Sequence, residues 1–180
     1  MPLSSAKAAF FGGFLFTLTL REHMFYNWRM ETIVKLKDIA TQMHLEPAEE
    51  KRTAVPPRIA PCGQPLPNRS QKKALGIHDA VMPNGKTIPL LKTLQTSACE
   101  RNCFYCPFRA GRNYRRTTFQ PDELASIFMQ MHRAGVVQGL FLSSGIIKGG
   151  VITQDKILAT AEILRQTHHF RGSVHLKIMP

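Results

Sequence analysis

Residues 97–112 read SACERNCFYCPFRAGR, and this stretch decides how the rest of the chain is interpreted. It contains Cys99, Cys103 and Cys106 in the spacing C-x3-C-x2-C. Three cysteines this close together are poorly placed for a disulfide framework, whereas thiolates are strong ligands for zinc and for iron–sulfur clusters. We therefore expect a metal site in a reducing compartment, the cytoplasm, with the fourth cysteine, Cys62, standing apart from it.

The composition indicates a globular protein with a strong positive charge. The chain has 180 residues, of which 43% are hydrophobic and 20% are charged, so a disordered chain is disfavoured. Lysine and arginine number 24 against 12 acidic residues, a formal net charge of +12. This charge favours an anionic partner such as nucleic acid, an acidic redox protein or a phosphate-bearing substrate, and a solvated basic surface explains it equally well.

The first segment, residues 1–29, contains an apolar run from Ala8 to Leu20. The run is shorter than a membrane-spanning helix and a glycine pair interrupts it, so we predict no membrane span. No small-x-small cleavage site follows, which makes a signal peptide the weaker interpretation. We favour a start codon assigned too early, with translation beginning at Met24 or Met30, and we expect the preceding residues to be disordered.

Residues 30–75 are predicted to form a helix followed by a proline-rich linker. Apolar residues recur at helical spacing in the first part, at Ile33, Leu36, Ile39, Ala40 and Met43. Residues 45–70 hold half of the twelve prolines, which favours an extended arm.

Residues 76–180 alternate between strand and helix patterns. The stretch 77–96 predicts two strands around an Asn84-Gly85 turn, and the second strand leads directly into the cysteines. The pattern then predicts a helix from Pro121 to Gly135, a strand over 136–145, a helix capped by Thr153 and closed by Gly172, and a strand over 173–180. This alternation predicts a parallel sheet in an α/β fold.

Three cysteines leave a metal site one ligand short. A structural zinc site needs four ligands, and the fourth would have to come from Cys62 or from one of His132, His168, His169 and His175. A [4Fe–4S] cluster held by three thiolates would keep one iron open for a substrate or cofactor.

The motif Cys99-x3-Cys103-x2-Cys106, with Tyr105 just before the last cysteine, resembles the radical S-adenosylmethionine (radical SAM) superfamily. The resemblance implies a [4Fe–4S] cluster on these cysteines, with S-adenosylmethionine bound to the open iron. Reductive cleavage of that cofactor gives a 5′-deoxyadenosyl radical, which abstracts hydrogen from a substrate. The implied fold is a (β/α) barrel of the TIM type, which this chain would contain only in part, truncated at its C-terminal end.

The same resemblance implies further cofactor contacts. Tyr105 would lie against the adenine. The family carries a short motif with glycine and glutamate at the end of the second barrel strand, which contacts the methionyl amine. Here the matching place holds Ser143-Ser144-Gly145 without a glutamate, so serine hydroxyls and backbone carbonyls would have to accept from the ammonium group.

The last strand carries two polar residues on one face. His175 and Lys177 alternate with Val174, Leu176 and Ile178. If helices cover the apolar face, His175 and Lys177 point into the barrel interior, and we interpret them as candidate catalytic residues. A buried, hydrogen-bonded histidine is the alternative.

The chain from about Met30 onward is similar to a radical SAM subgroup described as DNA modification or repair proteins. That similarity implies DNA or RNA as a partner and a flavodoxin- or ferredoxin-type electron donor. Arg109, Arg112, Arg115 and Arg116, which follow the cysteines, are the candidate docking residues for either one. The alternative function is a non-catalytic iron–sulfur or zinc protein that binds nucleic acid.

Overall fold

The computed structural model describes residues 20–43, 69–82 and 84–178. The helices are α1 (Leu20–Met43), α2 (Arg69–Ala74), α3 (Pro121–Arg133) and α4 (Gly150–Glu162), and α4 continues as a π-helical turn over Ile163–Thr167. The strands are β1 (Ile77–Val81), β2 (Thr87–Leu94), β3 (Gly139–Ser143) and β4 (Ser173–Leu176).

The described strands form one open sheet in the order β1-β2-β3-β4. β1 pairs antiparallel with β2, while β2, β3 and β4 are parallel to one another. Leu91, Leu140 and Val174 lie side by side across the three parallel strands. The sequence predictions of a hairpin, a parallel sheet and an α/β fold are therefore confirmed for this part of the chain.

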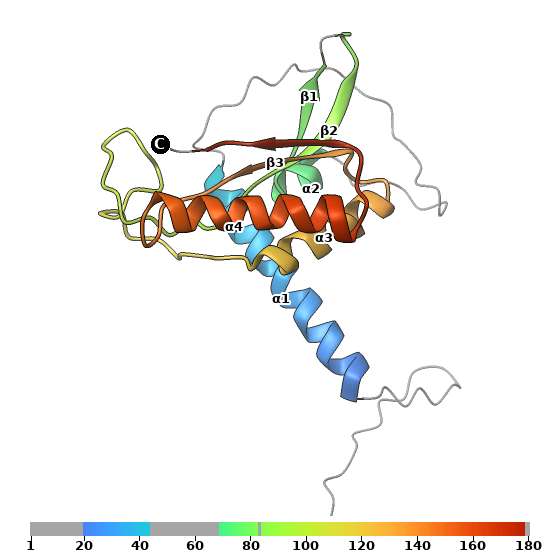
Figure 1. Cartoon of the computed structure of the whole chain (residues 1–180), viewed down its shortest axis with the longest axis horizontal. Helices are drawn as coiled ribbons and strands as arrows, with labels where there is room; N and C mark the ends of the chain where they lie inside the picture. The colour runs from blue at the N-terminus through green and yellow to red at the C-terminus, as the bar shows by residue number, and fades with distance from the viewer. Residues whose placement is uncertain (1–19, 44–68, 83, 179–180) are drawn as a thin grey trace, which may run out of the picture.

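The hairpin turn has the chemistry that its sequence indicated. Gly85 adopts a φ of +76°, a conformation that residues with a Cβ rarely take. The side chain of Asn84 accepts a hydrogen bond from the backbone N–H of Lys86 at 3.0 Å. Figure 1 shows the hairpin extending from the end of the sheet opposite to the cysteine region.

The α3 and α4 helices pack on one face of the sheet, and α1 contacts both β2 and α3 (Figure 1). A single hydrophobic core joins these layers. It includes Leu36, Ile39 and Met43 from α1, Leu91 from β2, Leu124 and Phe128 from α3, Leu140 and Leu142 from β3, and Ile157 from α4. Val174 and Leu176 of β4 pack against this core, as expected for the helix-covered side of the sheet.

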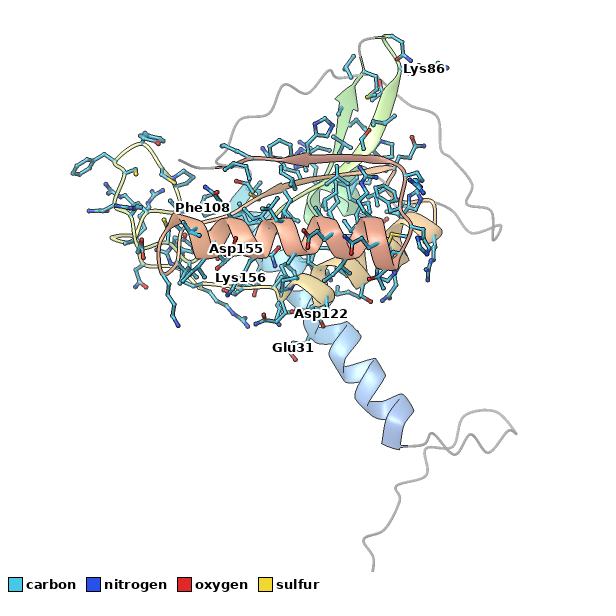
Figure 2. The ribbon with its side chains drawn as sticks, viewed as in Figure 1. Glu31, Lys86, Phe108, Asp122, Asp155 and Lys156 are labelled. Atoms are coloured by element: carbon cyan, nitrogen blue, oxygen red, sulfur yellow. The ribbon has the colours of Figure 1, made fainter. Side chains whose placement is uncertain are left out.

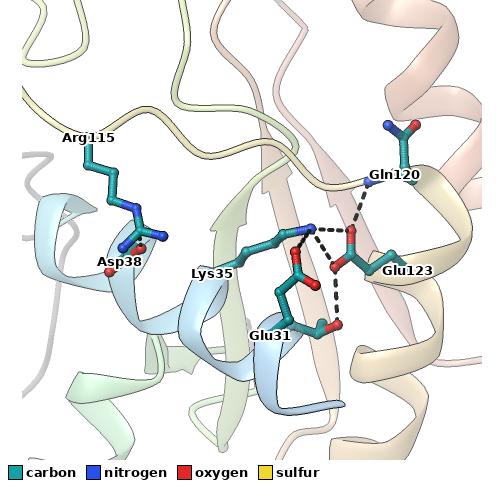
Figure 3. Close-up of polar contacts among 7 residues, drawn as sticks. Glu31, Lys35, Asp38, Arg115, Gln120 and Glu123 are labelled. Carbon is teal, nitrogen blue, oxygen red and sulfur yellow. Dashed lines mark hydrogen bonds and ion pairs between the residues drawn. The ribbon is translucent and has the colours of Figure 1, made fainter. Parts of the chain in front are cut away.

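The contact between α1 and α3 also has a polar part (Figure 3). Glu123, only 5% exposed, accepts hydrogen bonds from Lys35 Nζ at 2.9 and 3.1 Å and from Thr32 Oγ1 at 3.1 Å. Burial by itself lowers the pKa of Lys35, but the hydrogen bond and charge of Glu123, with the charge of Glu31, raise it overall. This ion pair fixes α1 against the first turn of α3.

The start of α3 follows the predicted signals. Pro121 occupies the first turn, and Glu123 Oε2 accepts a hydrogen bond from the backbone N–H of Gln120 at 3.2 Å. Gly135, with a φ of +72°, follows the end of the helix.

The predicted limits of α4 were wrong. The helix begins at Gly150, and Thr153 lies in its first turn, where its hydroxyl bonds with the backbone of Ile147 and Gly149. A helix start can use a threonine inside the first turn in place of a cap residue, because that hydroxyl still reaches the preceding loop. The π-helical turn ends at Thr167, so Gly172 does not close the helix.

The predicted helix over residues 30–43 is present, and α1 extends it back to Leu20, before Met30. The proposed divisions at residues 1–29, 30–75 and 76–180 remain predictions, because most of the proline-rich arm and the first 19 residues lie outside the described part. Within the described ranges, no helix is both long enough and apolar enough to span a bilayer.

Candidate functional site

The three cysteines lie on one loop, residues 98–116, which we call the cysteine loop. Its two ends are held together: Ser97 N–H donates to the carbonyl of Thr117 at 2.9 Å, and Phe119 N–H donates to that of Gln95 at 2.8 Å. The buried Gln95 side chain donates to the Phe119 carbonyl at 2.8 Å and accepts from Thr160 of α4 at 2.8 Å. The loop follows the carboxyl end of β2 (Figure 1). We call residues 95–97 and 117–119, which these hydrogen bonds join, the neck of the loop.

The first part of the cysteine loop continues the pairing of β2 with β3. Gly145 N–H donates to the Thr96 carbonyl at 2.8 Å, and Glu100 N–H donates to the Ile146 carbonyl at 2.7 Å. A Cβ on Gly145 would lie 2.2 Å from the carbonyl oxygen of Ala98, so only glycine fits there. This close approach fixes Cys99 against the turn that follows β3.

Backbone N–H groups point at two of the cysteine sulfurs. Cys99 Sγ accepts from the N–H of Arg101 at 3.4 Å and of Ile146 at 3.5 Å. Cys106 Sγ accepts from Phe108 N–H at 3.4 Å. Such donors stabilise thiolates and tune the properties of iron–sulfur clusters.

A pocket of about 280 Å³ opens at the carboxyl ends of β2 and β3. The residues that line it include all three cysteines, Tyr105, the turn Ser143-Ser144-Gly145, and Lys177. The pocket is also lined by Arg101 and by four apolar residues, Leu94, Pro107, Phe108 and Ile146. Figure 2 shows Phe108 at the base of the cysteine loop. The structure thus brings together three elements that are far apart in the sequence.

The turn after β3 is buried and partly bonded to itself. Ser143 and Ser144 are 4% and 7% exposed, and the Ser144 hydroxyl donates to the Gly145 carbonyl at 2.7 Å. The Ser143 carbonyl accepts from Gln95 N–H at 2.7 Å. Both serines line the pocket, and a hydroxyl that donates a hydrogen bond can still accept one.

The two candidate catalytic residues on β4 occupy different places. Lys177 lines the pocket, and its backbone N–H donates to the Leu142 carbonyl at 2.9 Å. His175 is exposed and lies outside the pocket lining, in register with Phe141 of β3 and Lys92 of β2. Lys92 is buried, with its Nζ 5.9 Å from the ring centre of Phe141. It was not predicted as a site residue because most of the surrounding strand is apolar.

The predicted docking arginines have unequal surroundings. Arg112 is exposed, Arg109 lies over the ring of Phe104 at 5.4 Å, and Arg115 pairs with Asp38 of α1 at 3.3 Å. Arg116 is half-buried and donates hydrogen bonds to backbone carbonyls of the cysteine loop and of Ser97. The docking role of the four arginines stays a prediction.

Tyr114 lies beside Arg116, with the guanidinium 3.7 Å from the centre of its ring. Its hydroxyl donates to the Ser97 carbonyl at 2.9 Å and accepts from Arg116. Burial raises the pKa of Tyr114, while the charge of Arg116 opposes that rise. The phenol therefore stays neutral, and remains a donor, throughout the physiological range of pH.

The three thiols that line the pocket are ligand types for both iron–sulfur clusters and zinc. All three thiols are free, with Cys103 exposed and the other two half-buried. Among the described residues, no three His, Cys, Asp or Glu side chains form a ready-made metal-binding group. A [4Fe–4S] cluster on three thiols would keep one iron without a protein ligand, and a structural zinc site would need a fourth ligand.

Comparisons of this chain with protein-family models, with curated proteins and with solved structures each found no match. The site is therefore interpreted from its own residues and geometry.

Proposed function

We propose that this chain is part of a radical SAM enzyme, which binds a [4Fe–4S] cluster and S-adenosylmethionine at the pocket below the cysteine loop. The observation that carries the proposal is the convergence in that pocket of Cys99, Cys103 and Cys106 with Tyr105 and the turn after β3. The three cysteines were predicted from their spacing, whereas Tyr105 and the turn Ser143-Ser144-Gly145 were predicted from the resemblance to the radical SAM superfamily. The turn is about forty residues away from the cysteines in the sequence, yet it lines the same pocket.

The arrangement of the strands supports the finer fold. In parallel α/β proteins, binding sites form at the carboxyl ends of the strands. The pocket lies at such an edge, and α3 and α4 cover one face of the sheet, as the outer helices of a (β/α) barrel do. We propose that β2, β3 and β4 are the first strands of an incomplete barrel, with the uncovered face as its interior.

Reductive cleavage of S-adenosylmethionine at the cluster supplies the radical chemistry of this superfamily. The chain would supply binding and orientation. Cys99, Cys103 and Cys106 would hold the irons, and the N–H groups that face Cys99 and Cys106 would disperse thiolate charge. Ser143 and Ser144 would accept from the cofactor ammonium, and Lys177 would face its carboxylate. Leu94, Phe108 and Ile146 would keep water from the reacting atoms.

Cofactor cleavage by the reconstituted protein tests this proposal. After anaerobic loading with iron and sulfide, we expect about four irons per chain, and S-adenosylmethionine should change the paramagnetic signal of the reduced cluster. Dithionite should then drive release of 5′-deoxyadenosine and methionine, measured by chromatography. Tight zinc with no iron, or a cluster that never responds to the cofactor, would favour the non-catalytic alternative.

The loop arginines favour an anionic substrate, and we propose nucleic acid. The net charge of +12 supports this choice, as does the 87% exposed ring of Phe104, on which a base could stack. Changing Arg109 and Arg112 together to glutamine should weaken binding of single-stranded DNA or RNA. The slope of log affinity against log salt should become shallower by about 1.4 units if both arginines contact phosphates of a single strand.

The same double variant separates nucleic acid from an acidic electron donor. Dithionite-driven cleavage should be unchanged in either case, because these side chains lie outside the pocket lining. If flavodoxin-driven turnover falls while nucleic-acid affinity and its salt slope stay constant, the arginines dock the donor and the substrate proposal loses its main support.

A further inference from the structure

Among the described residues, the Arg116 side chain donates hydrogen bonds to more backbone carbonyls of the cysteine loop than any other side chain does. Its Nη1 donates to the carbonyls of Ser97 at 2.8 Å and Phe108 at 2.7 Å. Its Nη2 donates to the carbonyls of Arg109 at 2.7 Å and Arg112 at 3.0 Å. One guanidinium thereby joins the neck of the loop to the segment that follows Cys106.

The backbone of the loop forms neither helix nor strand, so its carbonyls lack the regular partners of those structures. Carbonyl groups that are withdrawn from water must find a donor elsewhere. A guanidinium presents five N–H groups in a fixed plane and is always charged, so it can satisfy several carbonyls at once. An ammonium group on a flexible stem cannot reproduce that fork, even though it carries the same charge.

Tyr114 holds the guanidinium in place. Its ring lies against the face of Arg116, and its hydroxyl donates to the same Ser97 carbonyl that Arg116 binds. The ring of Phe108 meets Tyr114 edge-on, with 6.3 Å between ring centres. Phe108 also lines the pocket and donates its N–H to Cys106 Sγ, so the contacts form one path from Arg116 to a thiol.

We propose that Arg116, supported by Tyr114, is a positioning residue that sets the conformation of the cysteine loop before any metal binds. The contacts are all within the chain, so only the consequence for cluster assembly rests on the proposed function. A loop ordered in advance would present its thiols to one side, which reduces the conformational entropy lost when the irons are bound.

Arg115 offers a matched control. It is the neighbouring residue of the same type, but its side chain is 73% exposed and pairs with Asp38 of α1. Among the described residues, its guanidinium makes no hydrogen bond with a carbonyl of the cysteine loop. A general effect of removing positive charge from the loop should therefore appear equally at both positions, while a positioning effect should appear only at Arg116.

Hydrogen exchange of the metal-free, full-length protein tests the positioning role. Amides with loop acceptors, such as Cys106 N–H to Cys103 and Ala110 N–H to Arg101, should be protected in the wild type. Arg116→Lys and Arg116→Met should speed their exchange by about tenfold or more, since bonds to a charged group are lost. Exchange in β3 and α3 should be unchanged. Arg115→Lys and Arg115→Met should leave the loop at wild-type rates.

An unprotected loop in the wild type would overturn the proposal without any variant, even if Arg116→Met failed to fold. So would equal exchange in the wild type and Arg116→Lys. Iron loading gives the second measurement. Arg116→Lys should bind less iron than Arg115→Lys, and whatever cluster forms should give a broadened paramagnetic signal. If the wild type takes up no iron at all, the proposed function fails, whereas the exchange result still decides the role of Arg116.

Discussion

Changing Cys99, Cys103 or Cys106 to alanine, one at a time, should abolish the iron–sulfur cluster. Each cysteine lines the same pocket, and each would be one of only three protein ligands of the proposed cluster. A cluster that already lacks one protein ligand has little tolerance for losing another. We expect iron per chain to fall to background and the visible absorption of the cluster to disappear, with cofactor cleavage lost in all three variants.

Cys62→Ala is the matched control, since it removes one thiol far from the motif in sequence. It should retain full iron content and full cleavage. Loss of the cluster in this variant would mean that Cys62 is the fourth ligand of a closed site, and the open iron that the proposed chemistry needs would be absent. Circular dichroism should show that all four variants keep the wild-type helix content.

The sequence predicted most of the fold because the local signals of these elements agree with their packing. The turn at Asn84-Gly85 determines the hairpin. Pro121 and Glu123 mark the start of α3, and apolar periodicity identifies its buried face. The limits of α4 were missed because a threonine in the first turn gives the same pattern as a threonine cap, and because the π-helical turn has no clear sequence signal.

The candidate site was predicted as a set of residues, but its supporting contacts were not. Spacing alone identifies Cys99, Cys103 and Cys106, and the order of elements places the turn after β3 near them. Nothing in the sequence separates Arg116 from Arg112 and Arg115, because all three belong to one basic stretch. In the folded chain, Ser97 pairs with Thr117, and the neighbouring Arg116 donates a hydrogen bond to the Ser97 carbonyl. Contacts of this kind depend on tertiary structure, which residue types and spacing do not encode locally.

The second large effect concerns the carboxylate that joins α1 to α3. Glu123→Ala should lower the free energy of unfolding by about 3 kcal/mol, because a buried ion pair and its hydrogen bonds are lost together with a helix-capping bond. For a chain of this size, that corresponds to a fall of roughly 6–12 °C in the midpoint of thermal unfolding. Glu123→Gln keeps the shape and an acceptor oxygen, so it should cost less.

The pair between Arg115 and Asp38 supplies the control for this prediction, as it also joins α1 to the neighbouring loop segment (Figure 3). Its arginine side chain is 73% exposed, against 26% for Asp38. Arg115→Gln should change the free energy of unfolding by less than about 1 kcal/mol.

Because the pKa of Lys35 is raised above its ordinary 10.5, Lys35 stays charged below that pH, and its contribution to stability is lost only as the pH rises through the raised value. The difference in the free energy of unfolding between Glu123→Ala and the wild type should therefore be constant from about pH 7 to 9. Equal, small effects of Glu123→Ala and Arg115→Gln would mean that the hydrophobic contacts of Leu36 and Ile39 alone hold α1 in place.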